Sequence, residues 1–231
     1  MPILRALVLN YQDDARARTA KDEYLFGPDF LVAPVIDEGT QRAVYLPPGN
    51  WIDYWTGKPA AGGEVVVADV PLDSIPVWVR AGAVVPKIPE DVMTLVPRAE
   101  SGNTTVKSLD SRRVYEVIGG GAGGEVTDFE GRVLARRANS LKITGRAARV
   151  TVRWRFGSVA GATVNGTPAT VEGGADGPSV TFDHAATSLV EWREGVPPTP
   201  VVKPAPAAVA APAPAPTKKT THRRSRRRKK R

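Results

Sequence analysis

The chain contains no cysteine among its 231 residues, so it has neither a disulfide nor a cysteine-ligated metal. Aromatic residues are scarce, at 6% of the sequence. No apolar run approaches the roughly 20 residues that cross a bilayer as a helix. Glycine and proline are frequent, with 22 and 21 residues, alongside 42% hydrophobic residues. This composition is typical of a β-rich protein with many turns.

Acidic residues are absent after Glu194, whereas ten lysines and arginines lie in residues 218–231. Outside that tail, 22 basic residues face 24 acidic ones, so the rest of the chain is close to −2 despite the net charge of +8. The basic pI therefore reflects the tail rather than a basic face of the folded part. The N-terminus lacks the pattern of a signal peptide, which matters only if Met1 is the true start, so the compartment stays open.

Residues 3–9, ILRALVL, predict a strand buried on both faces, as in a parallel barrel. Asp13–Asp14 predicts the start of a helix that Gly27–Pro28 ends. The rest of the pattern is β. The predicted strands are residues 30–36, 43–46, 51–55, 64–70, 77–85, 104–109, 113–118, 132–136, 140–144, 149–156, 162–164, 179–182 and 188–192. Short strands separated by Gly, Asn and Asp turns predict a sandwich.

Four ordered motifs carry a resemblance to a known family. They are PILRALVLNYQDDARA (residues 2–17), KDEYLFGPDFLVAPV (21–35), VYLPPGNWIDYWTG (44–57) and IPVWVRAGAVVP (75–86). Their order and gaps resemble the join between the catalytic barrel and the C-terminal β-sandwich of glycoside hydrolase family 31, which includes α-glucosidases and α-xylosidases. Residues 103–193 resemble the distal C-terminal domain of that family only loosely.

The resemblance and the strand pattern together predict a mainly β fold with two C-terminal β-sandwich domains, preceded by a β/α remnant of a TIM barrel. The expected parts are a barrel remnant at 1–30, a proximal sandwich at 31–88, a distal sandwich at 100–194, a Pro/Ala-rich linker at 195–217 and a disordered basic tail at 218–231.

As an implication of the resemblance, the enzyme would hydrolyse α-glycosidic bonds with retention, using a nucleophilic carboxylate and a carboxylic acid. In the family both lie on earlier barrel strands, so no catalytic residue is assigned here and the chain alone is expected to be inactive. No cofactor or metal is expected. The expected partner is the missing N-terminal catalytic part, and an α-glucoside or α-xyloside is a substrate only of the full-length enzyme. Because a lone barrel strand exposes apolar faces, a shortened chain that starts near Phe30 is expected to be more soluble.

Trp51, Asp53 and Trp55 are the candidate carbohydrate contacts. Aromatic faces suit the C–H surface of a sugar, and a carboxylate can bind its hydroxyls. The alternative, which the resemblance favours, places the tryptophans in the sandwich core. The candidates support a second hypothesis, in which a noncatalytic carbohydrate-binding or scaffold module is tethered by its basic tail to an anionic surface such as envelope polymer, lipid or nucleic acid.

Other motifs predict structural roles. Carboxylate pairs such as Asp22–Glu23 are expected to be solvated, because adjacent residues on a strand point to opposite faces. Residues 119–124, GGGAGG, match the spacing of a nucleotide-binding loop but precede a strand rather than a helix, so a hairpin is expected. His184 is expected in a turn without a catalytic partner, and Asn165–Gly166 predicts a tight hairpin turn.

Overall fold

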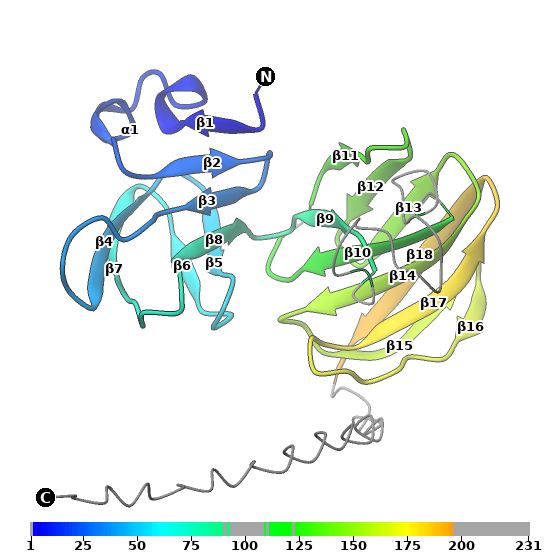
Figure 1. Cartoon of the computed structure of the whole chain (residues 1–231). Coiled ribbons are helices and arrows are strands. Elements are labelled where there is room, and N and C mark those ends of the chain that lie inside the picture. Colours follow the sequence, from blue (N-terminus) through cyan, green and yellow to red (C-terminus); the bar gives the residue numbers. More distant parts are fainter. Residues whose placement is uncertain (1, 90–91, 93–108, 110, 122, 196–231) are drawn as a thin grey trace, which may run out of the picture. The chain divides into compact units, whose positions relative to one another are not determined.

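The computed structural model describes residues 2–89, 92, 109, 111–121 and 123–195, which form a mainly β protein as predicted (Figure 1). The described residues belong to one compact unit and build four sheets. The strand predicted at 104–109 apart from Leu109, the linker apart from Gly195, and the basic tail lie outside them. None of the described helices has the length and apolar character that a membrane crossing requires.

Strands β1 to β8, termed here the first β part, form a six-stranded antiparallel sheet in the order β1-β2-β3-β8-β5-β6 and a separate two-stranded antiparallel sheet of β4 and β7 (Figure 1). The strands are β1 (Leu4–Ala6), β2 (Tyr24–Phe26), β3 (Phe30–Val32), β4 (Gln41–Leu46), β5 (Asn50–Asp53), β6 (Pro59–Ala61), β7 (Glu64–Asp69) and β8 (Val77–Arg80). The short helices η1 (Leu7–Leu9) and α1 (Ala15–Thr19) follow β1. The Asp14 carboxylate caps α1 by accepting the backbone N–H groups of Arg16 and Ala17, at 2.9 and 3.1 Å.

The structure does not show the barrel remnant that was expected in residues 1–30. The predicted long strand ends at Ala6, pairs antiparallel with β2, and its outer residues are exposed rather than buried on both faces. The reason is local: the chain turns at Leu7, whose carbonyl accepts the backbone N–H groups of Asn10 and Tyr11, both at 3.0 Å. The predicted helix ends early, and Tyr24–Phe26 forms a strand because it pairs with Phe30–Val32.

The core of the first β part joins both of its sheets and the segment before them. Leu7 and Leu25 are fully buried with Trp51, and Val44 of the two-stranded sheet packs in the same cluster. Burying such side chains contributes about 1.5–3 kcal/mol each. The residues before Phe30 are therefore an integral layer of this part.

Strands β9 to β18, termed the second β part, form a sandwich. A four-stranded sheet has the order β17-β14-β10-β9 and a six-stranded sheet has the order β11-β12-β13-β18-β15-β16. The strands are β9 (Val84–Lys87), β10 (Arg112–Ile118), β11 (Glu125–Thr127), β12 (Val133–Arg137), β13 (Ser140–Thr144), β14 (Ala148–Arg155), β15 (Val159–Val164), β16 (Thr167–Ala169), β17 (Ser179–His184) and β18 (Thr187–Glu194). The pairing of β10 with β14 is parallel, whereas the other pairings in both sheets are antiparallel.

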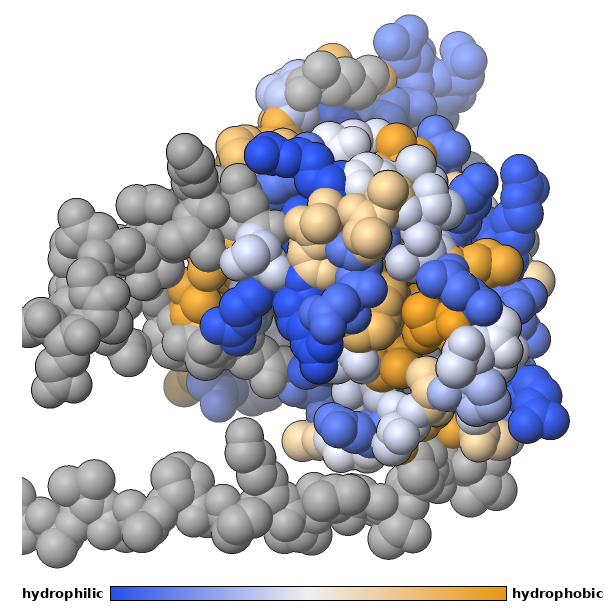
Figure 2. All heavy atoms as spheres, turned by 90° about the vertical axis from the view of Figure 1, so that its right-hand side faces the viewer, coloured by the Kyte–Doolittle hydropathy of each residue, from blue (hydrophilic) through white to orange (hydrophobic). Residues whose placement is uncertain are grey.

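Alternation of apolar and polar residues builds the sandwich core. Strand β14 reads ARVTVRWR, and Val150, Val152 and Trp154 are buried while the residues between them are more exposed. The ring centroids of Trp154 and Trp192 lie 5.5 Å apart, edge to face, which joins the two sheets. On the face shown in Figure 2, hydrophilic and hydrophobic residues are interspersed, as on a solvated sheet surface.

The turn between β8 and β9 makes two close backbone contacts that require glycine. The strand predicted at 77–85 breaks at Gly82, which has a φ of +87°. A Cβ on Gly82 would lie 2.8 Å from the backbone nitrogen of Gly123, and a Cβ on Gly121 would lie 2.7 Å from the carbonyl oxygen of Ala81. The glycine-rich segment therefore packs its backbone onto this turn. A strand follows it as predicted, but β10 and β11 belong to different sheets, so the segment is a crossover and not a hairpin.

Candidate functional site

The fold separates Trp51 from the other two predicted carbohydrate contacts, Asp53 and Trp55. Trp51 is fully buried, its indole N–H donates to the Pro47 carbonyl at 2.7 Å, and the Arg80 guanidinium lies 4.6 Å from its ring centroid. Trp51 thus has no surface to offer a ligand here. Trp55 follows β5 and is 55% exposed, with its indole N–H held by the Ile75 carbonyl at 2.7 Å.

Asp53 orders the turn that carries Trp55. Its Oδ1 accepts the backbone N–H groups of Trp55 and Thr56, at 2.8 and 2.9 Å. The Tyr54 ring packs edge to face against Trp55 with centroids 5.4 Å apart. One face of a rigid indole beside a second aromatic ring can stack on a sugar.

A fully buried carboxylate, Glu116 of β10, joins the two β parts. Its Oε2 accepts the Tyr54 hydroxyl at 2.9 Å, and its Oε1 pairs with Lys87 at 3.3 Å and with Arg155 at 3.5 Å. The Arg155 guanidinium also lies 4.1 Å from the Tyr54 ring centroid and donates to the Tyr54 carbonyl at 2.9 Å. The sequence shows no local signal for this network, because its members come from β9, β10, β14 and the turn after β5.

The N-terminal edge of the first β part carries an open hollow of about 450 Å³, lined by residues that include Leu4, Glu23 and Ile36. Glu23 is 6% exposed and its Oε2 accepts the Tyr45 backbone N–H at 3.1 Å. Burial raises the pKa of Glu23 to about 7. The expectation of a solvated Asp22–Glu23 pair is therefore wrong for Glu23, whereas Asp22 pairs with Arg42 at 2.5 Å.

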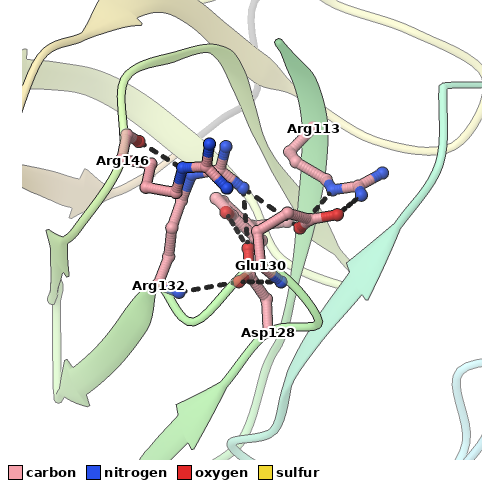
Figure 3. Close-up of polar contacts among 6 residues, drawn as sticks. Arg113, Asp128, Glu130, Arg132 and Arg146 are labelled. Carbon is pink, nitrogen blue, oxygen red and sulfur yellow. Dashed lines mark hydrogen bonds and ion pairs between the residues drawn. The ribbon is translucent and has the colours of Figure 1, made fainter. Parts of the chain in front are cut away.

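An ion-paired turn joins β11 to β12 (Figure 3). Asp128 Oδ1 accepts the backbone N–H groups of Glu130 and Arg132, at 3.1 and 2.8 Å. The Arg132 side chain is fully buried and pairs with Asp128 at 3.0 Å and with Glu130 at 3.1 Å. Glu130 lies between Arg132 and Arg113, and Arg113 Nε donates to its Oε2 at 2.8 Å. This network of ion pairs and hydrogen bonds fixes the turn that carries Phe129.

His184 is not a turn residue as expected. It ends β17, is buried, and its Nδ1 lies 2.8 Å from the Ser188 hydroxyl. Burial lowers the pKa of His184, which favours the neutral ring. Among the described residues, no group of three or more His, Asp or Glu side chains is placed to hold a metal ion.

Comparison with known proteins identifies the first β part. Residues 1–85 match the family profile described as "Glycosyl hydrolase family 31 C-terminal domain". The chain is 48% identical over 82 residues to the sulfoquinovosidase of Escherichia coli K12, covering 35% of this chain and 12% of that protein. It is 39% identical over 92 residues to the alpha-xylosidase of Saccharolobus solfataricus, covering 39% and 13%. The chain thus spans little more than a tenth of the length of these curated relatives.

A solved structure extends the likeness beyond the profile. The cycloalternan-forming enzyme from Listeria monocytogenes, in complex with a pentasaccharide substrate, superposes with a TM-score of 0.66 at 27% identity. The match covers 85% of this chain and 21% of that chain. The family resemblance expected from the four motifs is confirmed.

Proposed function

Residues 1–85 match the C-terminal domain of glycoside hydrolase family 31, and from this premise we propose that the chain supplies the C-terminal β part of a retaining α-glycoside hydrolase. The observation that carries the proposal is the profile match together with the uncovered edge at Leu4 and Ile36. These side chains are 54% and 64% exposed and line the same hollow. Their exposure fits an edge that a catalytic part covers.

The intact enzyme and this chain are expected to differ in their catalytic carboxylates. A retaining glycosidase needs a nucleophile and an acid about 5–5.5 Å apart. The family carboxylates precede the residues present here, so purified 1–231 should not hydrolyse an aryl α-glucoside or α-xyloside. The free chain is then a structural partner of a catalytic part. Turnover that co-purifies with the chain, and that disappears on one internal substitution such as Glu116→Gln, would contradict the proposal.

A chimera tests the structural role directly. The 82-residue segment of the E. coli sulfoquinovosidase that matches this chain is replaced by residues 1–85, and hydrolysis of an aryl sulfoquinovoside is followed. We expect a soluble, active chimera. The double change Leu4→Asp and Ile36→Asp should abolish its assembly, because it places two charges at the covered edge.

Leu72→Asp is the matched control for the chimera, since Leu72 is fully exposed and lies outside that hollow. It should leave activity within about twofold, in line with the small effect of most surface substitutions. An active Leu4→Asp, Ile36→Asp chimera would show that this edge is not covered.

A second function is favoured by the exposed face of Trp55. The chain would then be a noncatalytic carbohydrate-binding or scaffold module, with Asp53 positioning the ring and the basic tail as a tether to an anionic surface. Calorimetric titration with maltooligosaccharides should give a saturable signal that Trp55→Ala removes. Deleting residues 218–231 should abolish retention on DNA or anionic vesicles, and retention should fall steeply with salt. Sugar binding that survives Trp55→Ala refutes the assignment to this ring.

A further inference from the structure

The turn between β11 and β12 presents an aromatic ring to solvent at the edge of a small hollow. Phe129 is 85% exposed, and the hollow of about 240 Å³ is lined by Phe129, Pro86 and Ile88 with the charged side chains of Lys87, Arg113 and Glu130 around them. An exposed phenylalanine is unfavourable in water.

The turn that carries Phe129 is held by ion pairs and hydrogen bonds. Asp128 and Arg132 flank it, and both are buried and paired with one another at 3.0 Å. Asp128 Oδ2 also accepts the Tyr115 hydroxyl at 2.7 Å. Arg132 Nε donates to the Arg146 carbonyl at 2.8 Å (Figure 3). Buried ion pairs cost desolvation and are better suited to fixing one geometry than to adding stability. These contacts fix the backbone of the turn that carries Phe129.

We propose that this hollow, termed here the Phe129 hollow, is a binding subsite for one hexopyranose ring of an α-glucan or related oligosaccharide. The ligand follows from the pattern of the walls. A pyranose has apolar C–H faces, which match the Phe129 ring with Pro86 and Ile88, and a rim of hydroxyls, which the partly exposed Lys87 ammonium can bind. Arg113 and Glu130 are buried and paired with one another, so they shape the wall of the hollow. The hollow is smaller than the roughly 300–1,000 Å³ of pockets for drug-sized ligands, which favours a single ring.

The Phe129 hollow lies in the second β part and is formed by β9, β10 and the β11–β12 turn, so it shares no residue with the Trp55 turn. It is independent of the proposed structural role, because the chimera contains only residues 1–85 and lacks Phe129. The failure of either idea leaves the other standing.

Calorimetric titration and affinity electrophoresis of the full chain with maltoheptaose and with dextran test the proposal. We expect saturable binding that Phe129→Ala weakens by about tenfold or more, equivalent to about 1.4 kcal/mol. Phe26→Ala is the matched control, because Phe26 is a second exposed phenylalanine, 44% exposed, outside this hollow. Binding to these neutral glucans should be insensitive to salt, which excludes a contribution of the basic tail.

A second variant checks that the loss of binding does not come from misfolding. Ile88→Lys changes another residue that lines the hollow and should weaken binding without changing the circular dichroism spectrum, since Ile88 is half exposed. Absence of binding to either glucan, or equal binding by Phe129→Ala and Phe26→Ala, would overturn the proposal. Loss of binding on Trp55→Ala alone would also overturn it and assign the sugar to the other turn.

Discussion

Replacing Glu116 by alanine should lower the free energy of unfolding and weaken the coupling between the two β parts. The substitution leaves the Tyr54 hydroxyl, Lys87 and Arg155 without the carboxylate that all three contact. Breaking a buried pair costs about 3–5 kcal/mol. The Lys87 side chain is 33% exposed and can rehydrate, and Arg155 keeps its bond to the Tyr54 carbonyl. We therefore expect a loss near the lower limit, about 3 kcal/mol.

The assay is urea unfolding followed by tryptophan fluorescence and by circular dichroism. In a parallel thermal melt, a loss of about 3 kcal/mol corresponds to a fall in Tm of roughly 6–12 °C for a folded body of this size. The wild-type probes should coincide in one transition, whereas those of Glu116→Ala should diverge as the parts uncouple. Glu116→Gln keeps an acceptor for Tyr54 and should lose less.

Arg149→Ala is the control, because the Arg149–Asp183 pair at 2.8 Å is solvent exposed. Exposed pairs contribute about 0–1 kcal/mol. If Glu116→Ala costs no more than Arg149→Ala, or if its two probes still coincide, the carboxylate does not couple the parts and the reasoning is wrong.

Three further predictions rest on named contacts. Gly82→Ala should lower the free energy of unfolding by roughly 2–4 kcal/mol, because the new Cβ would meet the backbone of Gly121 and Gly123. Gly131→Ala has a similar φ of +83° but open space around it, so in the same urea unfolding experiment it should cost only about 1–2 kcal/mol of backbone strain. Because the folded pKa of Glu23 is raised to about 7 from 4.5, the folded state binds its proton more tightly and stability should fall as pH rises from 4.5 to 7; Glu23→Gln should flatten that slope in thermal melts. Deleting residues 1–29 should lower solubility, contrary to the expectation from sequence, because it removes core side chains and bares the edge of β3; an equal or higher soluble yield would contradict this.

Most strands of the second β part follow from sequence, because alternation is a local property. The strand at Ser140–Thr144 coincides with its prediction, and the turn predicted at Asn165–Gly166 is confirmed by φ values of +52° and +78°. The start of the chain misleads for the opposite reason. An apolar run such as ILRALVL has no period, so only its tertiary partners decide that it ends at Ala6 and pairs antiparallel.

Candidate sites are harder to predict than strands. The pattern WIDYW marks an aromatic cluster but does not say that Trp51 points into the core while Trp55 points out. Phe129 is a case with a usable signal: an Asp directly before it and a Gly two residues after it predict a tight turn, and an apolar residue at the tip of a turn is exposed. Glu116 carries no such signal, since its neighbours Tyr115 and Val117 make it look like part of an apolar strand.

The position of β18 has a consequence for the order of folding. Although it is the last strand of the described residues, β18 lies inside its sheet, paired on one side with β13 and on the other with β15. During synthesis, which proceeds from the N-terminus, the two halves of that sheet therefore wait for residues 187–194 before they can join. The first β part needs none of these residues, so it can fold while the second is still an open array of unpaired edges. A ribosome that stalls between these two stages would expose aggregation-prone strands, and folding of the second β part should be the slow, late phase of refolding.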